Sequence, residues 1–397
     1  MDALMLPSNW QRVRLGDIAE IIGGGTPSTQ ITSFWNGSIN WFTPTEIGIT
    51  KYVHKSQRTI TPLGLKKSSA KLLPIGTILL TSRASIGDCA ILKVVATTNQ
   101  GFQSLIPLEK INNEFLYYLM LTLKNKLLKL ASGSTFLEVS PNKIKNLLIP
   151  LPPLNEQIAI ANILSDVDRY LYSLDALILK KESVKKALSF ELLSQRKRLK
   201  GFNQAWQRVR LGDICEFGNG GAYETLIVEN GNFKLISLNS IDIDGNLKNT
   251  MKRVNFYDNS LKQDDIVMVL SDVAHGDFLG LCAVIPSNDY VLNQRMGRLR
   301  MRNDCINILF LRLYINANQK YFKMQGQGSS QLNLSKKAIE DFEILLPPLD
   351  EQIAIANILS DVDNEIISLK NKKRQFENIK KALNHDLMSA KIRVLKK

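Results

Sequence analysis

Apolar residues recur in two long segments of the chain, at a spacing that alternates between four and three. The first series is Ile160, Leu164, Val167, Leu171, Leu174 and Ile178, and the second is Ile355, Leu359, Val362, Ile366 and Leu369, followed by Lys373 and Phe376. An average spacing of about 3.5 is typical of a coiled-coil seam and not of the broader apolar face of a globular helix. Proline pairs at 152–153 and 347–348 oppose helix before them, and Asn155 and Asp350 are the expected N-caps.

Each segment predicts a helix of about 40 residues, which is about 60 Å long at about 1.5 Å per residue. One such helix alone is marginal in water, so we expect the two to pack against each other. Because a whole globular region separates them in the sequence, the pattern favours an antiparallel coiled coil with pseudo-two-fold symmetry.

The rest of the chain is dominated by short apolar runs between turn residues. The runs at 75–82, 88–95, 264–271 and 279–285 predict strands, and the segments 113–131 and 307–324 predict one helix in each half. We therefore expect an α+β fold, in which two mixed α/β domains are joined by the two long helices.

An internal repeat divides the chain. The sequence WQRVRLGDI at 10–18 recurs unchanged at 206–214, and LPPLNEQIAIANILSDVD at 151–168 recurs at 346–363 with one substitution. The two offsets are 196 and 195 residues, which excludes a solenoid with its short, many-fold period. The repeat predicts globular domains at 1–150 and 202–345 and helical regions at 151–201 and 346–397.

Composition narrows the possible functions. The chain has 397 residues, with 51 Lys and Arg against 37 Asp and Glu, so its formal charge of +14 favours a polyanionic partner. No run approaches the about 20 apolar residues of a membrane helix. The N-terminus shows no secretion signal, and the cytoplasm is the expected compartment. The four cysteines and three histidines are scattered, which argues against a disulfide framework or a metal site.

A glycine-rich segment opens each half, GGGTPS at 23–28 and GNGGAYE at 218–224. Neither precedes the Gly-Lys-Ser/Thr of a phosphate-binding loop, so a nucleotide site is disfavoured. Either the segment is an ordinary surface turn or glycine allows the backbone to approach a ligand closely. In the second case the candidate ligand-binding residues are Gly24, Thr26, Ser28 and Tyr223.

Three further pairs of polar loops recur in both halves. Residues 97–103 align with 292–298, residues 132–135 with 326–331, and residues 82–85 with 271–275. Asn and Gln can read adenine, Arg can read guanine, and Ser or Thr can bond a base edge or a phosphate, although any one of them can equally belong to a polar turn. The candidates are Arg83, Ser85, Asn99, Gln100, Gln103, Ser132, Ser134 and Thr135 in the first half, and His275, Asn293, Gln294, Arg295, Gln327, Ser329 and Gln331 in the second.

Basic residues run along both predicted long helices. They are Lys180, Lys181, Lys185, Lys186, Arg196, Lys197, Arg198 and Lys200 in the first, and Lys370, Lys372, Lys373, Arg374, Lys380 and Lys381 in the second. Such runs indicate either the solvated face of a coiled coil or a surface over which a phosphate backbone passes. The repeated SDVD places two carboxylates two residues apart, and on a helix such side chains point away from each other. This spacing does not suit a metal site, and it favours a helix face that binds a partner.

The sequence resembles the specificity subunits of type I restriction-modification systems. The similarity covers essentially the full chain, through WQRVRLGDI, GGGTPS, NQGFQSLIP at 99–107 and the repeated LPPL[N/D]EQIAIANILSDVD. In the second half MGRLR replaces GFQSL and GNGGAYE replaces GGGTPS. The resemblance there therefore covers the scaffold of the domain better than its candidate contact residues.

The resemblance implies a non-catalytic reader of double-stranded DNA. Each target-recognition domain would read half of a bipartite asymmetric site, and the helices would set the spacer. Two modification (methyltransferase) subunits would dock on the helices, and restriction subunits would join through them. No catalytic residue, metal or cofactor is expected in this chain, since S-adenosylmethionine, ATP and Mg²⁺ would belong to the partner subunits.

The partner contacts are expected at the helix starts, on Glu156, Gln157, Asp166, Asp168, Glu351, Gln352, Asp361 and Asp363. The alternative hypothesis is a coiled-coil scaffold or adaptor that binds proteins through its globular ends.

Overall fold

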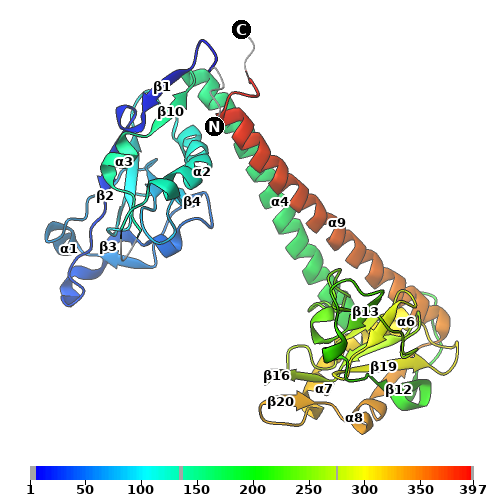
Figure 1. The fold of residues 1–397 in the computed structure, drawn as a ribbon. Coiled ribbons are helices and arrows are strands. Elements are labelled where there is room, and N and C mark those ends of the chain that lie inside the picture. The colour runs from blue at the N-terminus through cyan, green and yellow to red at the C-terminus, as the bar shows by residue number, and fades with distance from the viewer. Residues whose placement is uncertain (1–5, 134–136, 274–275, 395–397) are drawn as a thin grey trace. The chain divides into compact units, whose positions relative to one another are not determined.

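The computed structural model describes residues 6–133, 137–273 and 276–394 (Figure 1). The chain forms two compact units, Met1–Ala176 with Asn371–Lys397 (unit 1) and Leu177–Lys370 (unit 2). Two long helices, α4 (Leu154–Leu193) and α9 (Leu349–Met388), each contribute one half to each unit. Each unit combines one globular part with halves of both helices. The predicted division into four domains that follow one another in the sequence stays a prediction.

Unit 1 is built on a five-stranded sheet with the order β2-β9-β6-β7-β4. These strands are Ala19–Gly23, Gln103–Pro107, Ile78–Leu80, Cys89–Leu92 and Tyr52–Val53. A second sheet has the order β5-β3-β8, with strands Arg58–Ile60, Trp35–Phe42 and Ala96–Thr98. Helix α2 (Asn113–Leu130) packs on β6 and β7, and its buried residues share one apolar core with the first sheet and with the start of α4.

Smaller elements complete unit 1. Strand β1 (Gln11–Arg14) pairs antiparallel with β10 (Leu148–Leu151), next to helix α3 (Pro141–Lys145). Helix α1 (Pro62–Lys66) follows β5, and short 3-10 turns lie at Leu15–Asp17, Thr32–Phe34 and Pro44–Glu46. The first copy of the repeated WQRVRLGDI therefore forms the strand and turn that connect the globular part to the base of α4.

Unit 2 repeats this plan. Its four-stranded sheet has the order β12-β19-β15-β17, with strands Cys215–Asn219, Met296–Met301, Ile266–Val269 and Cys282–Val284. A three-stranded sheet has the order β14-β13-β18, with strands Arg253–Val254, Phe233–Ile236 and Tyr290–Leu292. The strand pairs are β11 (Gln207–Arg210) with β21 (Glu343–Leu346) and β16 (Ser271–Val273) with β20 (Gln331–Asn333). The helices are α5 (Leu211–Ile214), α6 (Ile308–Ala317), α7 (Gln319–Gln325) and α8 (Lys336–Glu340), with 3-10 turns at Glu224–Leu226 and Leu238–Ser240.

Most predicted elements are confirmed, and one helix differs. The helix predicted at 113–131 is α2, and the four apolar runs contain β6, β7, β15 and β17. The helix predicted at 307–324 is broken into α6 and α7 at Asn318, whose side-chain amide donates to the Tyr314 carbonyl 2.8 Å away. An asparagine that bonds the backbone in this way competes with the helical hydrogen bonds.

Both long helices have the predicted length of 40 residues and begin directly after the proline pairs. They start at Leu154 and Leu349, so Asn155 and Asp350 lie in the first turn and are not the N-caps that the sequence suggested. Within each unit the two helix halves run antiparallel. In unit 1 Asp168 pairs with Lys380 at 2.5 Å, and the next carboxylate along α4, Asp175, pairs with the earlier Lys373 at 2.6 Å.

Unit 2 contains similar pairs between the helices. Lys185 pairs with Asp363 at 2.5 Å, Lys181 with Glu365 at 2.7 Å, and Lys370 with Glu182 at 2.7 Å. Five lysines of the two basic runs are therefore neutralised across the helix pair, which favours the coiled-coil interpretation for those five. Lys180, Lys186, Lys372 and Lys381 remain exposed.

Candidate nucleic-acid interface

In unit 1 the predicted polar loops are joined to one another by backbone hydrogen bonds. The glycine segment meets the loop after β8, because Gly25 N–H donates to the Thr98 carbonyl at 2.9 Å. That loop meets the next one, since Ser82 N–H donates to the Gly101 carbonyl at 2.8 Å. A Cβ at Gly24 would lie 1.9 Å from the Asn99 carbonyl oxygen, so the close approach requires glycine there.

The remaining loop of unit 1 joins the same group. Arg83 pairs with Glu138 at 2.7 Å, and the backbones of Ser132 and Glu138 exchange hydrogen bonds of 3.0 and 3.1 Å. We call the segments 24–28, 82–85, 99–103 and 132–133 loop group 1. Four segments that are far apart in the sequence thus form one continuous surface feature.

Unit 2 assembles the equivalent loops in the same way. Gly221 N–H donates to the Leu292 carbonyl at 3.0 Å, and Leu270 N–H donates to the Arg295 carbonyl at 3.0 Å. Strand β16 pairs with β20, which places Gln331 opposite Val273. We call the segments 220–224, 271–273, 293–295 and 327–333 loop group 2.

The equivalent backbone contacts correct the sequence alignment of the two halves by one residue. Asn99 N–H donates to the last residue of β3 at 3.0 Å, and Asn293 N–H donates to the last residue of β13 at the same distance. Asn99-Gln100 and Asn293-Gln294 therefore occupy the same positions, whereas the sequence comparison set Asn99 beside Gln294. The structure thus reveals an identical Asn-Gln pair in both loop groups.

The asparagines of these pairs hold the loops themselves. Asn99 Oδ1 accepts from Gly101 N–H at 2.8 Å. Asn293 is buried, accepts from Gln294 N–H at 2.9 Å and donates to Glu224 at 2.7 Å. The Asn99 oxygen and the Asn293 amide are therefore engaged within their own loops.

The exposure of the other candidates separates them into two classes. Gln103 is buried on β9, and the hydroxyl of Ser85 is also buried. The side chains available at the surface of the loop groups are Thr26, Ser28, Gln100 and Ser132 in unit 1, and Tyr223, Gln294, Arg295, Gln327, Ser329 and Gln331 in unit 2. Thr26 donates to the side chain of Gln100, and Tyr223 donates to Asp258 at 2.8 Å. Ser134, Thr135 and His275 lie outside the described residues.

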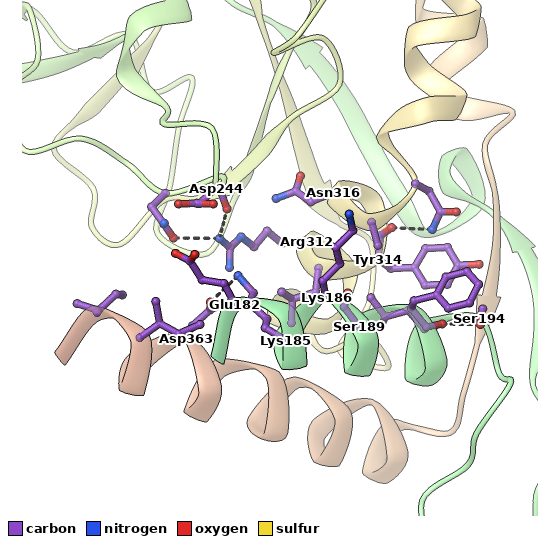
Figure 2. A pocket seen from close by; sticks show the side chains of 18 of the residues that line it. Glu182, Lys185, Lys186, Ser189, Ser194, Asp244, Arg312, Tyr314, Asn316 and Asp363 are labelled. Atoms are coloured by element: carbon purple, nitrogen blue, oxygen red, sulfur yellow. Dashed lines mark hydrogen bonds and ion pairs between the residues drawn. The ribbon is translucent and has the colours of Figure 1, made fainter. Parts of the chain in front are cut away.

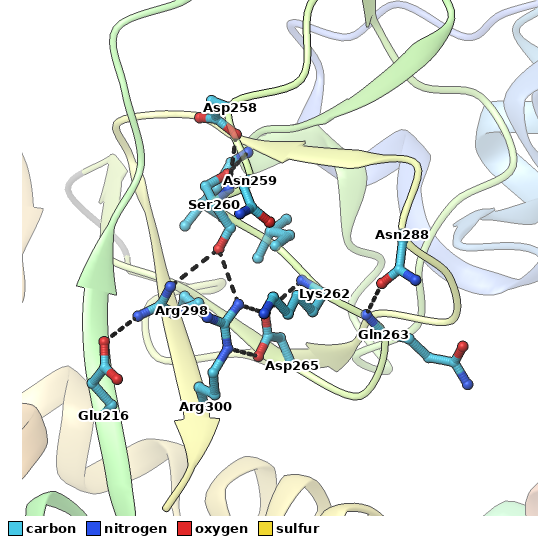
Figure 3. Close-up of polar contacts among 12 residues, drawn as sticks. Glu216, Asp258, Asn259, Ser260, Lys262, Gln263, Asp265, Asn288, Arg298 and Arg300 are labelled. Carbon is cyan, nitrogen blue, oxygen red and sulfur yellow. Dashed lines mark hydrogen bonds and ion pairs between the residues drawn. The ribbon is translucent and has the colours of Figure 1, made fainter.

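The MGRLR segment that distinguishes unit 2 supports the connection between β14 and β15 (Figure 3). Arg300 of β19 binds Asp265 through two hydrogen bonds of 2.8 and 2.7 Å, and this pairing raises the pKa of Arg300. Arg298 binds Glu216 at 2.6 Å and the Ser260 carbonyl at 3.3 Å. Both arginines are thus bound by groups of unit 2 itself and position the 258–265 connection.

The helix-start residues are buried inside their own units. Glu156 accepts from the Trp10 indole N–H at 3.1 Å and from Arg393 Nε at 2.9 Å. In unit 2 Glu351 accepts from Trp206 at 2.9 Å and from Arg198 at 2.6 Å, and these bonds raise the pKa of Arg198. We call these two clusters the glutamate joints.

The adjacent glutamines are equally enclosed. Gln157 accepts from Asn112 N–H at 2.9 Å, and Gln352 accepts from Asn307 N–H at 2.8 Å. The partner contacts predicted at Glu156, Gln157, Glu351 and Gln352 stay a prediction that the structure does not support, because all four residues are at most 1% exposed. Asp168 and Asp363 are engaged in helix–helix pairs, and only Asp166 and Asp361 are exposed.

The sequence comparison missed the arginines of the glutamate joints, although a signal for them exists. Arg198 and Arg393 follow a second, shorter repeat, KKAL at 185–188 and 380–383. They are separated by 195 residues, the same offset as Glu156 and Glu351. Each arginine comes from the chain just beyond one long helix and closes the base of the other.

The two units differ where the globular part meets the helices. In unit 2 a cavity of about 870 Å³ lies between α6 and the helices, and Arg312 reaches from α6 toward Asp244 (Figure 2). Arg312 donates to the Gly245 carbonyl at 2.9 Å, and burial lowers its pKa. Lys185, Lys186 and Glu182 of α4 line the opposite wall.

At the corresponding place in unit 1 a buried lysine joins the globular part to α4. The Lys51 ammonium donates to the Tyr118 hydroxyl at 2.9 Å and to Ser165 at 2.8 Å, and pairs with Glu114. Burial lowers the pKa of Lys51. Asn384 of α9 adds a hydrogen bond of 3.2 Å to the Tyr118 carbonyl, whereas unit 2 has the shorter Ser189 at the equivalent position.

Within residues 6–133, 137–273 and 276–394, no three His, Cys, Asp or Glu side chains are grouped so as to hold a metal ion. Among these residues no helix is long and apolar enough to cross a bilayer. Cys215 is buried, which raises the pKa of its thiol to about 12. Such a thiol is a poor nucleophile at neutral pH.

Comparison with known proteins identifies the family. The model of the type I restriction modification DNA specificity domain matches residues 7–181 and 203–378. The chain belongs to this family. Each match covers one globular part and most of the long helix that follows it, so each half of the chain carries one DNA specificity domain.

Named relatives agree with this assignment. The MjaIX specificity subunit of Methanocaldococcus jannaschii is 42% identical over 167 residues, covering 41% of this chain and 39% of that protein. The EcoR124I/EcoR124II specificity subunit of Escherichia coli is 37% identical over 161 residues, 39% of this chain and 40% of that one. These two matches therefore span about two fifths of either relative. The MjaVIII specificity subunit is 28% identical with 99% of this chain and 95% of that protein covered.

Solved structures of the specificity family share the fold. The S subunit from M. genitalium superposes with a TM-score of 0.60 at 20% identity, covering 97% of this chain and 98% of that one. A chain from a study of complex assembly and conformational transition of the type I system gives a TM-score of 0.63 at 19% identity, with 97% and 98% covered.

Proposed function

We propose that this chain is the non-catalytic, sequence-specific DNA-binding subunit of a type I restriction-modification complex. Each half would read one part of a bipartite asymmetric site in double-stranded DNA through its loop group. The observation that carries the proposal is the recurrence of one loop arrangement in both units with different exposed side chains. Unit 1 presents Gln100 beside Thr26, whereas unit 2 presents Gln294 beside Arg295. Equivalent scaffolds with different readers suit two different half-sites.

The long helices have two roles in this proposal. Their 40 residues correspond to about 60 Å at about 1.5 Å per residue, which would hold the half-sites more than one duplex turn of about 34 Å apart. Their exposed faces, including Asp166 and Asp361, would receive two modification subunits, and restriction subunits would join through these. S-adenosylmethionine, ATP and Mg²⁺ would be bound by the partner subunits.

The decisive experiment is to determine the methylated motif in the genomic DNA of the host. We expect one bipartite motif that disappears when the gene for this chain is deleted and returns on complementation. Exchanging the 97–103 segment for that of another specificity subunit should alter one half of the motif only. A host genome with no motif that depends on this chain would contradict the proposal and favour the protein-binding scaffold.

The spacer role has a separate test. Removing one heptad from each long helix at facing positions shortens each by about 10 Å, or about three base pairs. We expect a shorter spacer between unchanged half-sites, read from the methylated motif. An unchanged spacer would refute the role of the helices as a ruler.

A further inference from the structure

The connection that follows β5 in unit 1 differs in length and charge from its equivalent in unit 2. Residues 61–77 separate β5 from β6, whereas residues 255–265 separate β14 from β15. The 17 residues in unit 1 include Lys66, Lys67 and Lys71 and no acid. The 11 residues in unit 2 include one lysine and three aspartates. The unit 1 connection is therefore positive and its counterpart negative.

The positive connection lies against loop group 1. A Cβ placed on Gly25 would be 2.3 Å from the backbone nitrogen of Ala70, so the two backbones are in direct contact. The Trp41 indole donates to the Gly25 carbonyl at 2.9 Å, and the Trp35 indole donates to the Ser28 carbonyl at 3.0 Å. The glycine segment is thus fixed between the 99–103 loop and the 61–77 connection.

The cations around this segment are free of acidic partners. Lys66, Lys67 and Lys71 are exposed, and in the part of the chain that the structure describes no carboxylate lies within 4.0 Å of their ammonium groups. Arg58 stacks on the Trp35 ring, with its guanidinium carbon 3.8 Å from the ring centroid, and within the same described residues it also lacks a carboxylate partner. Stacking holds the guanidinium in place while its N–H donors stay available.

The position equivalent to Arg58 is neutralised in unit 2. Phe42 and Ile236 end equivalent strands, so Trp41 corresponds to Leu235. Trp41 faces Arg58, and Leu235 N–H donates to the Lys252 carbonyl at 2.8 Å, so Arg58 corresponds to Lys252. Lys252 pairs with Glu224 at 3.3 Å. Lys234 pairs with Asp289 at 2.9 Å. Within the described residues Arg58 therefore lacks a carboxylate partner, whereas its equivalent in unit 2 forms an ion pair.

We propose that Arg58, Lys66, Lys67 and Lys71 form the main phosphate-backbone contact of the chain, and that unit 1 carries more of the salt-dependent DNA affinity than unit 2. This inference rests on the proposed function. Free cations beside a loop group match the charge of a duplex backbone, and each phosphate they neutralise releases counterions.

The test compares two triple variants of the full chain, purified in the complex that it forms in its host. One variant is K66A/K67A/K71A, and the control R12A/K110A/K145A removes three exposed cations from the opposite, helix-proximal part of unit 1. The measurement is the dissociation constant for a duplex with the host's methylated motif, and for a scrambled duplex, between 50 and 200 mM salt.

We expect the slope of log affinity against log salt to fall by about 2.7 in the first variant, at about 0.9 per phosphate contact. Preference for the motif over the scrambled duplex should stay the same, because phosphate contacts carry no sequence information. The control should keep the wild-type slope. K66R/K67R/K71R should also keep it, which separates lost charge from misfolding.

Three outcomes would overturn the inference. The first is an unchanged slope in K66A/K67A/K71A, and the second is an equal loss in the control. The third is loss of complex assembly with an unchanged slope, which would assign the lysines to a protein partner. Failure of the proposed function is distinct, because the wild-type complex would then bind no motif and the host DNA would show none.

Discussion

The glutamate joint of unit 1 provides the sharpest test of how the chain is held together. Glu156 is 1% exposed, and its carboxylate receives the Trp10 indole N–H and the Arg393 guanidinium. Replacing Glu156 with alanine removes the acceptor from both. The indole of Trp10 is only 5% exposed, so water cannot easily replace the lost hydrogen bond.

The structure sets the size of the effect. An unsatisfied buried N–H costs about 1–3 kcal/mol, and a hydrogen bond to a charged group contributes about 1.5–3 kcal/mol. The Arg393 side chain is 31% exposed, so water can partly replace its lost hydrogen bonds. The contribution of Arg393 to the destabilisation is therefore near the lower end of this range. We therefore expect Glu156→Ala to lower the free energy of unfolding of unit 1 by about 3 kcal/mol. Glu156→Gln keeps an oxygen for Trp10 and should cost about half as much.

The assay is urea unfolding of the full chain without other subunits, with hydrogen exchange to assign the loss to peptides of unit 1. Asp166→Ala, an exposed position about three turns along the same helix, is the matched control and should stay within about 0.5 kcal/mol of wild type. Glu351→Ala should affect peptides of unit 2 instead. A Glu156→Ala chain as stable as the control would refute the structural role and restore the subunit-contact interpretation.

Three further predictions concern the recognition part of unit 1. Gly24→Ala should abolish discrimination at the first half-site, because its Cβ would collide with the Asn99 backbone, whereas Gly23→Ala, with 3.6 Å to its nearest neighbour, should preserve the methylated motif. Gln100→Ala should relax base preference at the first half-site with an unchanged salt slope, which binding assays with substituted duplexes can show; loss of affinity for every sequence would contradict this. Burial lowers the pKa of Lys51 in the folded state, so the unfolded chain binds that proton more tightly and stability should rise as the pH increases toward the ordinary lysine pKa of 10.5. Lys51→Met should lack this rise, measured as the difference in urea midpoint between the two chains at each pH.

Short-range sequence patterns predicted the elements whose formation depends on neighbouring residues. The apolar spacing and the proline pairs predicted the starts of both long helices to within two residues. The break at Asn318 was missed because it depends on a side chain that bonds the backbone, and the apolar pattern of 307–324 continues through it.

The candidate site was predicted as a set of loops but not as a set of exposed side chains. Asn99 and Gln100 are adjacent and chemically alike, yet one amide is used by Gly101 and the other lies at the surface. Glu156 has the features of an exposed first-turn acid, and its burial is caused by Trp10 and Arg393, which are 146 and 237 residues away. Contacts of that range cannot be read from spacing.

The shared helices also determine the order in which the chain can be completed during synthesis. Unit 2 is one continuous stretch, Leu177–Lys370, and all of it has been translated before any of the final segment of unit 1. Unit 1 needs Asn371 onward, and its glutamate joint closes only when Arg393 has been added. At about 5–20 residues per second, the ribosome makes the later unit available first by a second or more. The half of the chain that is synthesised first is therefore the half that is finished last. Until Arg393 is added, Glu156 at the base of α4 lacks its arginine partner, and this joint is open to chaperones and proteases.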